Sequence, residues 1–435
     1  MESQREALPP ALNVEPVNFR QQLLSGPKSF FSGTQRSAPP SETLDLVRPY
    51  LRRAGVTRIA DVTGLDKVGI PTTLAIRPNA PTMACSSGKG LSLDAAIVSG
   101  AMEAIELYAA ENIQLHSLRR SYRELVGEFP AAPLDRLPLS KRSLFSKDWP
   151  FKWVLGWDVS QQRETAVPRA SVVMSKGRAD LSDLGAFVMS SNGLASGNSL
   201  IEAMAAALYE VVERDAVACT TAAWRAGVPP VQLTTRASVY PDVVREVLDQ
   251  CRSAGVRVAI FDTTVDTQIP TFVAYAYDSV DEGIGIYRGY GAHLDSTIAL
   301  LRAITEALQG RLNFIAGSRD DIFRSAFWRT TRARSRSFAA GVAAAESEGT
   351  TVAPSPSFAN QSFEEDINTM LVRLARAGLT QVVVLDLTPP DCPVSVVRVV
   401  VPGAEGYMHF GYTPGLRASR YEECPQSGHE PSDQR

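Results

Sequence analysis

Apolar residues recur at helical spacing in six long stretches of the chain, and shorter stretches rich in β-branched and aromatic residues lie between them. The first pattern predicts helices and the second predicts strands. The predicted helices are Ser41–Ala54, Ser92–Ile113, Ser199–Ala222, Pro241–Ala254, Asp295–Ile315 and Phe363–Ala377. The predicted strands are Arg58–Val62, Thr72–Ile76, Trp153–Val159, Ala170–Met174, Val256–Asp262, Thr271–Tyr277, Gln381–Leu387 and Val394–Val401. Their order is mixed, with no strict strand–helix alternation, which favours an α+β fold.

The two ends of the chain lack this periodicity. Residues 1–27 are polar and carry prolines, and residues 419–435 are poor in apolar side chains. We expect both ends to be mobile and residues 28–418 to form one composite unit. The Pro- and Ser-rich stretch Ala353–Ser357 is expected to be a surface loop.

Three of the predicted helices carry two acidic or amide side chains three positions apart, within otherwise apolar sequence. The pairs are Glu103 and Glu106, Glu210 and Glu213, and Glu306 and Gln309. Residues three apart lie side by side on one helix face, so each pair presents its oxygens in one direction. This spacing predicts polar ligands that project from surfaces which are otherwise core.

The first two of these helices also begin alike. Gly90-Leu91-Ser92-Leu93 and Gly197-Asn198-Ser199-Leu200 both stand 13 residues before the first glutamate of the pair, counted from the glycine. In the third copy Gly291 lies 15 residues before Glu306. The similarity indicates an internal structural repeat, which would bring equivalent helices around a shared centre.

Further polar residues fall on the same helix faces. Ser99 precedes Glu103 by four residues, and Arg302 precedes Glu306 by four. Asn198 and Glu202 share one broad face with Glu210 and Glu213, and Arg214 follows directly. An arginine at such a place can bind phosphate oxygens through two hydrogen bonds.

Several carboxylates that converge in an apolar setting need a cation to neutralise them, and Mg²⁺ prefers carboxylate, phosphate and water oxygens. The pattern therefore indicates a magnesium–nucleotide site. Two simpler interpretations stay open at this point: Glu202 as part of a capping box with Ser199, and Glu103 with Glu106 on a solvated stripe. The threefold repetition favours a shared site.

The stretch Ala84–Gly90 (ACSSGKG) precedes the first acidic helix and resembles a phosphate-cradling loop in composition. It lacks the GxxxxGK[ST] spacing of a P-loop, so a plain turn is an equal alternative. Its place before a helix N-terminus favours anion binding. The glycines around Tyr290 are spaced as in a strand with close backbone approaches, not as in a dinucleotide fingerprint.

Composition narrows the class of protein. With 44 basic and 47 acidic residues and no basic block, nucleic acid is not an expected partner. No apolar run of about 18 residues and no signal-like start occur, so neither membrane insertion nor secretion is expected. Five scattered cysteines without a CxxC indicate reduced thiols in the cytoplasm, and the absence of GxSxG gives no support to serine hydrolase chemistry.

Three stretches together resemble the three acidic motifs of the YcaO family: Ser99–Glu106 (SGAMEAIE), Ser196–Arg214 (SGNSLIEAMAAALYEVVER) and Glu306–Gln309 (EALQ). The likeness extends from about Lys28 to Ala418. Around the N-terminus, three further motifs are similar to the YcaO proteins that occur beside TfuA proteins: Gly33-Thr34-Gln35-Arg36, Glu42-Thr43-Leu44, and Asp61 to Asp66 with Gly69-Ile70-Pro71.

The resemblance implies an α+β fold in which pseudo-repeated acidic helices pack on mixed or antiparallel sheets. It also implies a homodimer, a cavity for ATP and Mg²⁺, and ATP-dependent phosphorylation of a backbone amide in a peptide or protein. A Cys, Ser or Thr side chain as nucleophile gives an azoline, whereas sulfide gives a thioamide.

The resemblance also implies roles for individual residues. Mg²⁺ ligands would be Glu103, Glu106, Glu202, Glu210 and Glu213. Ser99 and Asn198 would orient the nucleotide, Arg214 and Arg302 would bind phosphates, Glu306 and Gln309 would complete the pocket, and Lys28, Thr34, Arg36 and Lys89 are further phosphate-side candidates. Glu103, Glu213 and Arg214 would serve catalysis most directly.

Two departures from the family pattern shape the expected function. Many azoline-forming members end in a PxPxP tail, whereas this chain ends Pro431-Ser432-Asp433-Gln434-Arg435. No fused domain for peptide recognition is evident, so a separate TfuA-like partner is expected to help deliver the substrate. Thioamide formation is the leading hypothesis. An azoline-forming cyclodehydratase and a nucleotide-binding scaffold without chemistry are the alternatives, and a generic small-molecule ATPase is weaker.

Overall fold

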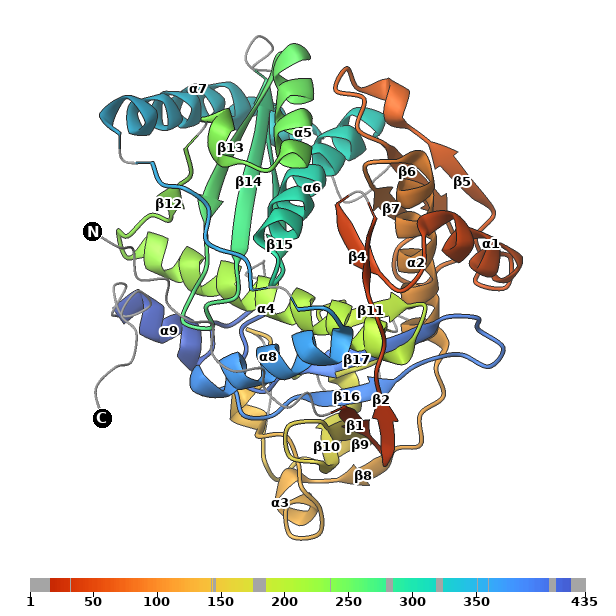
Figure 1. Cartoon of the computed structure of the whole chain (residues 1–435). Coiled ribbons are helices and arrows are strands. Elements are labelled where there is room, and N and C mark those ends of the chain that lie inside the picture. Colours follow the sequence, from red (N-terminus) through yellow and green to blue (C-terminus); the bar gives the residue numbers. More distant parts are fainter. Residues whose placement is uncertain are drawn as a thin grey trace, which may run out of the picture.

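The computed structural model describes residues 16–31, 33–141, 143, 146–174, 185–234, 236–278, 285–317, 324–349, 351–358, 360–406 and 412–423, with side chains left out at 237 and 324–335. The described chain contains five sheets, two of which are small two-stranded ones. The three larger sheets are each joined to long helices, and α4 (Leu200–Arg225) runs between two of them (Figure 1). The predicted α+β class with repeated acidic helices on antiparallel sheets is confirmed.

The largest sheet lies on one side of α4 and is antiparallel throughout, in the order β10-β9-β16-β17-β11 with β8 beside β9. Its strands are β8 Leu118–Arg120, β9 Phe151–Asp158, β10 Arg163–Pro168, β11 Leu194–Gly197, β16 Val383–Asp386 and β17 Ser395–Val400. Alternate side chains face opposite sides, as a strand requires. Val384 and Val397 pack with α4 and α8 (Phe363–Arg376), whereas Val383 and Val396 pack with α2 (Leu93–Asn112).

A second antiparallel sheet lies on the other side of α4, in the order β12-β13-β14-β15. Its strands are β12 Val231–Gln232, β13 Val256–Asp262, β14 Thr271–Asp278 and β15 Ile286–Ala292. One face packs on α5 (Asp242–Ser253) and α6 (Ser296–Ala316), and the other on α7 (Arg324–Glu348).

The third sheet, β5-β6-β7, packs on α2, which also contacts α1 (Pro40–Leu51). Its strands are β5 Arg58–Asp61, β6 Thr72–Ile76 and β7 Cys85–Lys89. The remaining elements are short: β1 Val17–Phe19, β2 Gln22–Leu24, β3 Ser29–Phe31, β4 Thr34–Arg36, α3 Tyr122–Leu125 and α9 Leu416–Glu423.

The internal repeat takes the form of a strand that leads directly into an acidic helix and packs on it: β7 with α2, β11 with α4, and β15 with α6. Glycine permits the close approach. A Cβ at Gly88 would lie 1.9 Å from the carbonyl oxygen of Ala96, and a Cβ at Gly291 would lie 2.1 Å from that of Ala299. No other residue fits without moving the helix away. The strand with close backbone approaches expected around Tyr290 is confirmed as β15.

Several expectations from the sequence are wrong. Ala170–Met174 is no strand: Arg169–Ser171 forms a 3₁₀ turn, and the apolar residues Val172 and Met174 are buried in irregular structure after β10. Ala84–Gly90 is no phosphate loop, because Cys85–Lys89 forms β7. The helix α7 was missed because its described sequence is rich in Arg, Ser and Ala without a continuous apolar stripe.

Both chain ends are more ordered than expected. Within residues 1–27, β1 and β2 form a hairpin whose Val17, Phe19 and Leu24 join the core around α4. Within residues 419–435, α9 continues to Glu423. Buried anchors outweigh the polar composition here, while residues 1–15 and 424–435 lie outside the described chain. The loop expected at Ala353–Ser357 is confirmed, and no described helix is both long and apolar enough to cross a membrane.

Candidate active site

The three strand–helix units surround one cavity of about 700 Å³. With one exception, every residue that the sequence suggested for a site lines this cavity: Thr34, Arg36, Lys89, Ser99, Glu103, Glu106, Asn198, Glu202, Glu210, Glu213, Arg214, Arg302, Glu306 and Gln309. They come from β4, β7, α2, α4 and α6 and, for Asn198, from the turn between β11 and α4, so residues about a hundred positions apart meet at one place. The repeat predicted from the sequence therefore brings these residues to one shared cavity.

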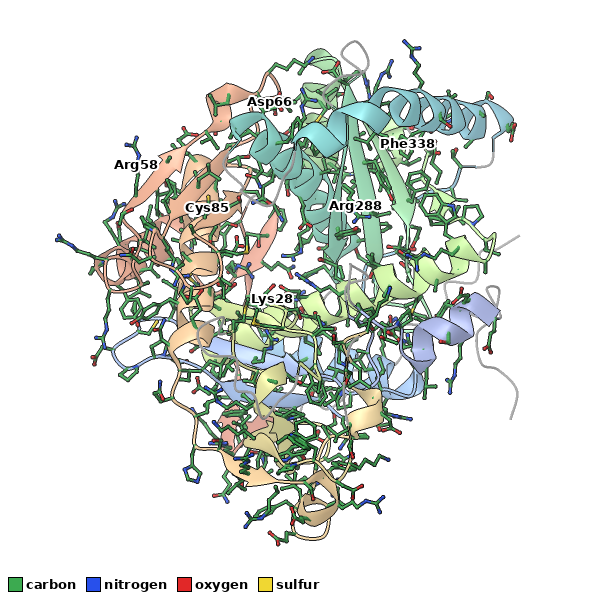
Figure 2. All side chains as sticks on the ribbon, turned by 180° about the vertical axis from the view of Figure 1, so that it is seen from behind. Lys28, Arg58, Asp66, Cys85, Arg288 and Phe338 are labelled. Carbon is green, nitrogen blue, oxygen red and sulfur yellow. The ribbon has the colours of Figure 1, made fainter. Side chains whose placement is uncertain are left out.

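Lys28 is the exception, since it is not among the cavity-lining residues. Its ammonium group forms an ion pair with Asp366 on α8, and both side chains are at most 2% exposed. Tyr209 donates a hydrogen bond of 3.0 Å to the same carboxylate. Figure 2 shows Lys28 beside α4. Lys28 therefore ties the N-terminal segment to α8 and has no phosphate-side position in this structure.

On α2, the two glutamates reach toward neighbouring strands. Glu103 accepts a hydrogen bond of 3.2 Å from the Ser87 amide on β7. Glu106 accepts bonds from the amide (2.8 Å) and the hydroxyl (2.6 Å) of Ser196 on β11. Burial raises the pKa of Glu106 to about 8, with the nearby carboxylates of Glu210 and Glu103 adding to the shift. The solvated-stripe interpretation is thereby wrong, because both side chains face the cavity.

Glu202 begins the acidic face of α4. Ser199 caps the helix by accepting from the Glu202 amide, but the Glu202 carboxylate does not reach back to close a capping box. It accepts instead from the amide and hydroxyl of Ser37, lies 3.7 Å from Arg36 Nε, and is 1% exposed. At the start of α4, Ser199 therefore caps the helix, whereas the carboxylate of Glu202 belongs to the cavity.

Farther along α4, Glu210 accepts from the Gly193 amide at 3.2 Å and lies 3.4 Å from Arg214 Nη2. Glu213 accepts from the Ala292 amide at 3.2 Å and lies 3.6 Å from Arg302 Nη2 on α6. Burial raises the pKa of Glu213, although the Arg302 guanidinium opposes the shift. A buried carboxylate with a raised pKa is one that lacks enough positive charge around it.

On α6, Glu306 and Gln309 join this unit to β7. Lys89 Nζ lies 2.7 Å from Glu306 Oε2. Burial alone would raise the pKa of Glu306, but Lys89 and then Arg302 lower it. Gln309 donates a hydrogen bond of 2.5 Å to the Ser87 carbonyl oxygen. Arg302 Nε is buried and has no hydrogen-bond partner among the described residues, so a donor for an anion remains at the cavity wall.

The donor set fits Mg²⁺ and phosphates by chemistry. Among the described residues no three acidic, His or Cys side chains already converge on one point as a metal-binding group. The carboxylates are spread around the wall and accept from amides, hydroxyls and cations. That arrangement suits Mg²⁺, which is commonly held by one or two carboxylates plus phosphate oxygens and waters. Lys89, Arg214 and Arg302 supply the positive charge that phosphates need.

Other lining residues were not assigned from the sequence: Ser87, Ser196, Arg288, Tyr290 and Asn313. Ser196 lies within a motif that was recognised, but its hydroxyl was given no role. Arg288 and Tyr290 alternate with Gly289 and Gly291, which face α6. The alternation along β15 could have identified them from the sequence, because side chains two residues apart in a strand point to the same face. It puts Arg288 and Tyr290 together on the face opposite the two glycines. Figure 2 labels Arg288 on this sheet.

Solved structures share this fold. A heterocyclase in complex with substrate and cofactor superimposes with a TM-score of 0.72 at 22% identity, over 92% of this chain and 56% of that chain. This chain therefore spans a little over half of that protein's length. YcaO from Methanopyrus kandleri bound with AMPPCP and Mg²⁺ superimposes with a TM-score of 0.65 at 23% identity, over 93% of this chain and 98% of that chain.

Sequence relatives extend over most of the chain. A Rhizobium leguminosarum bv. trifolii protein named "Uncharacterized protein in tfuA 3'region" is 35% identical over 394 residues, 88% of this chain and 92% of that protein. A protein of Methanothermobacter thermautotrophicus is 36% identical over 376 residues, 84% of this chain and 94% of its own length. The family described as YcaO cyclodehydratase, ATP- and Mg²⁺-binding, matches residues 87–405. This range covers the three strand–helix units except for the first two residues of β7. The chain belongs to the YcaO family of ATP- and Mg²⁺-binding proteins.

Proposed function

We propose that this protein uses ATP and Mg²⁺ to activate a backbone amide of a peptide or protein, and that sulfide then replaces the amide oxygen to give a thioamide. The observation that carries the proposal is the convergence of six glutamates and the cations Lys89, Arg214 and Arg302 on one cavity. The relative named for the tfuA region supports the thioamide product and a TfuA-like partner.

Different residues of the cavity would have different roles. Glu103, Glu106, Glu202, Glu210 and Glu213 would hold Mg²⁺, and Lys89, Arg214 and Arg302 would bind phosphate oxygens. When bound, ATP supplies the phosphoryl group that makes the amide oxygen a leaving group, and Mg²⁺ neutralises charge on the phosphates. Glu306 holds Lys89 in place, and Gln309 fixes the β7 backbone at Ser87.

The buried carboxylates also couple metal binding to protons. Glu106 and Glu213 have pKa values raised by burial, so part of each population is protonated near neutral pH when no metal is present. Mg²⁺ binds the ionised form, so its binding would release protons. This coupling predicts stronger Mg²⁺ binding at pH 8 than at pH 6.

The first test replaces a carboxylate without changing its size. Glu213→Gln should lower peptide-dependent ADP release by about 10²-fold or more, because the ligand charge is lost while the amide keeps the shape. Glu164→Gln on the exposed face of β10 is the matched control, since its side chain is half exposed and remote from the cavity. Turnover by Glu213→Gln equal to that of the wild type would defeat the metal-ligand assignment.

A second candidate is azoline formation, which the cyclodehydratase description of the family favours. Both products require ATP and a peptide, but their masses differ. A thioamide replaces one oxygen by sulfur, whereas an azoline loses one water. Mass spectrometry of the product peptide, with and without added sulfide, separates the two. ADP release without any peptide requirement would contradict both and favour a generic ATPase, and nucleotide binding without ADP release would favour a scaffold role.

We further propose that the active form is a homodimer that works with a TfuA-like protein. Sedimentation velocity of the protein alone and with a TfuA-like protein tests both assemblies. A monomer at every protein concentration would contradict the homodimer. An unchanged sedimentation coefficient after the TfuA-like protein is added would contradict the partnership.

A further inference from the structure

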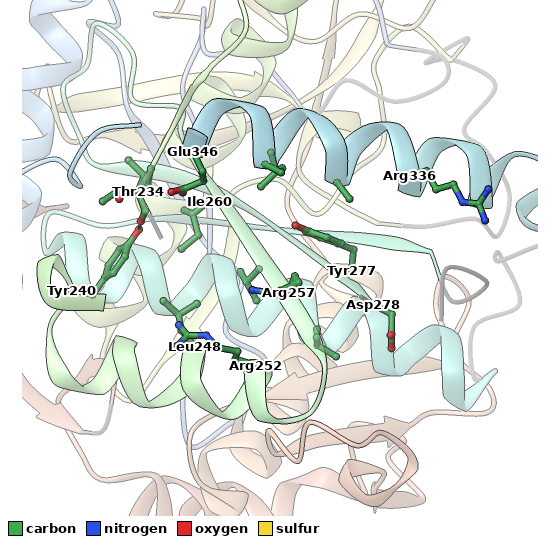
Figure 3. A pocket seen from close by; sticks show the side chains of 16 residues that line it. Thr234, Tyr240, Leu248, Arg252, Arg257, Ile260, Tyr277, Asp278, Arg336 and Glu346 are labelled. Atoms are coloured by element: carbon green, nitrogen blue, oxygen red, sulfur yellow. Dashed lines mark hydrogen bonds between the residues drawn. The ribbon is translucent and has the colours of Figure 1, made fainter. Parts of the chain in front are cut away.

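A second cavity, of about 400 Å³, lies along β13 between α5 and α7 (Figure 3). None of the residues proposed above for ATP, Mg²⁺ or catalysis lines it. Leu248, Val258 and Ile260 supply apolar surface from the α5 side of the sheet, and Ala339 and Val342 supply it from α7. Its volume is within the range of small-ligand and side-chain pockets.

The cavity follows a strand edge that the sheet leaves open. The edge strand β12 pairs only with Asp262 and Phe261 of β13. Leu233 still donates to the Ile260 carbonyl oxygen at 2.8 Å, but Thr234 turns away and donates to Val352. In an antiparallel strand every second residue points both backbone groups the same way. The N–H and C=O of Val258 therefore face the side where β12 has ended.

No hydrogen bond from the part of the chain that the structure describes reaches these backbone groups of Val258, and the residue is half-buried. An open edge with an apolar wall on each side fits an extended peptide, whose backbone pairs with the strand while its side chains point alternately to the two walls.

The charges around the cavity favour an acidic occupant. Arg252, Arg257 and Arg336 line it against Asp278 and Glu346. Arg252 already lies 3.1 Å from Asp249 on the same helix, so the preference for an acidic occupant rests on Arg257. Asp278 is already neutralised by Lys67 at 2.7 Å and Arg311 at 3.4 Å. Figure 3 shows Arg257 between the two helices, with Glu346 at the far end beside Thr234. Arg257 is exposed, so its guanidinium is accessible to a carboxylate on an incoming strand.

We propose that an extended segment of the peptide substrate, with an acidic side chain among apolar ones, adds as a strand to the open edge of β13. The identity of the peptide as substrate rests on the proposed function, whereas the edge site rests on β12, β13 and Arg257. On the same sheet, Arg288 and Tyr290 of β15 line the main cavity. Strand β15 is two strands away from β13, which corresponds to roughly 10 Å across the sheet. The segment would thus bind apart from the amide that reacts.

A random heptapeptide library displayed on phage, panned without nucleotide or Mg²⁺, tests the site directly. Wild-type protein should enrich peptides with acidic residues between apolar ones. Val258→Pro should lose this enrichment, because proline removes the N–H at the open edge yet is tolerated on an edge strand. Val258→Thr keeps both the N–H and the branched shape, so it should retain enrichment. No enrichment on wild type, or equal enrichment on Val258→Pro, would overturn the proposal.

A synthetic copy of the enriched peptide then tests the charge. Calorimetry should show at least tenfold weaker binding to Arg257→Glu than to wild type, and near wild-type binding to Arg257→Lys. Because Arg257 is exposed, these variants should fold even if Val258→Pro does not, and thermal melting checks this. Equal affinity for wild type and Arg257→Glu would overturn the edge site. These measurements need no turnover, so a failed Glu213→Gln test would contradict the proposed function and leave the edge site standing.

Discussion

At the scale of single residues, the candidate site contains carboxylates that are buried without enough positive charge. Glu106 is held by the two hydrogen bonds from Ser196, yet its pKa is raised to about 8 because burial penalises the ionised form. Glu213 has a guanidinium nearby and its pKa is still raised. Such groups store unfavourable free energy that a bound cation relieves.

The raised pKa of Glu106 has a measurable effect on stability. An unfolded glutamate ionises near its ordinary pKa of 4.5, whereas the folded one stays protonated up to about pH 8. Its contribution to stability is therefore fully present below pH 4.5 and is lost as the pH rises toward 8. In metal-free buffer, Glu106→Gln should gain on the order of 2 kcal/mol relative to wild type between pH 5.5 and pH 8.

Urea unfolding of both proteins at the two pH values measures this difference. The control is Glu164→Gln, because the side chain of Glu164 is half exposed. This variant should show no gain in stability relative to wild type between the two pH values. A constant difference between Glu106→Gln and wild type across this range would contradict the raised pKa.

At the scale of elements, the site depends on how closely each strand packs on its helix. In the first unit β7 lies against α2 at Gly88, and this contact sets where Glu103 and Glu106 enter the cavity. The equivalent contacts at Gly197 and Gly291 do the same for α4 and α6. A glycine in these strands is therefore a positioning feature of the site, since a helix pushed outward carries its carboxylates away.

We predict that Gly88→Ala destabilises the fold by about 2–4 kcal/mol, because its Cβ would meet the backbone of α2 at 1.9 Å. Chemical denaturation measures the loss, and Mg²⁺-ATP calorimetry should show weaker binding in the protein that remains folded. Gly341→Ala in α7 is the matched control: nothing lies within 4 Å of its Cβ, and alanine should stabilise that helix by about 0.5–1 kcal/mol. Equal stability of both variants would contradict the close-packing argument.

At the scale of the whole molecule, α9 fastens the C-terminal part of the described chain to α4. Arg417 binds Asp215, which follows directly on the cavity residues Glu213 and Arg214, and also binds Asp266 near β13 and β14. Burial raises the pKa of Asp215 to about 6 even though Arg417 lowers it, so this pair is mostly desolvated. The helices α9 and α4 and the loop between β13 and β14 thereby meet around the Arg417 guanidinium.

Removing the ion pairs of Arg417 should lower both the stability of the protein and its affinity for Mg²⁺-ATP. Arg417→Ala leaves the buried carboxylate of Asp215 unpaired, which costs about 3–5 kcal/mol. Thermal unfolding measures the loss, and Mg²⁺-ATP affinity should fall as the α4 segment around Glu213 loosens. The exposed Arg420→Ala on the same helix should change neither quantity. If Arg417→Ala is as stable as wild type, the ion pairs of Arg417 do not stabilise the fold.

The sequence by itself determined six of the long helices, fewer than half of the strands and the repeated acidic pairs that line the cavity. These features depend on local periodicity, so the spacing of Glu103 and Glu106 or of Glu210 and Glu213 was enough to place each pair on one face. The errors arose where local pattern and tertiary packing disagree. The apolar run Ala170–Met174 is buried as irregular chain, and the Gly-Lys-Gly stretch before α2 is strand β7.

Only the tertiary structure decided which side chains meet. Lys28 was expected on the phosphate side of the site, but the fold pairs it with Asp366 on α8, far along the chain. The contacts of Glu106 with Ser196 and of Lys89 with Glu306, and the open edge of β13, likewise join segments that no local pattern relates. Periodicity reports the direction of a side chain from its own element, whereas its partner and its pKa depend on which distant element the packing brings opposite to it.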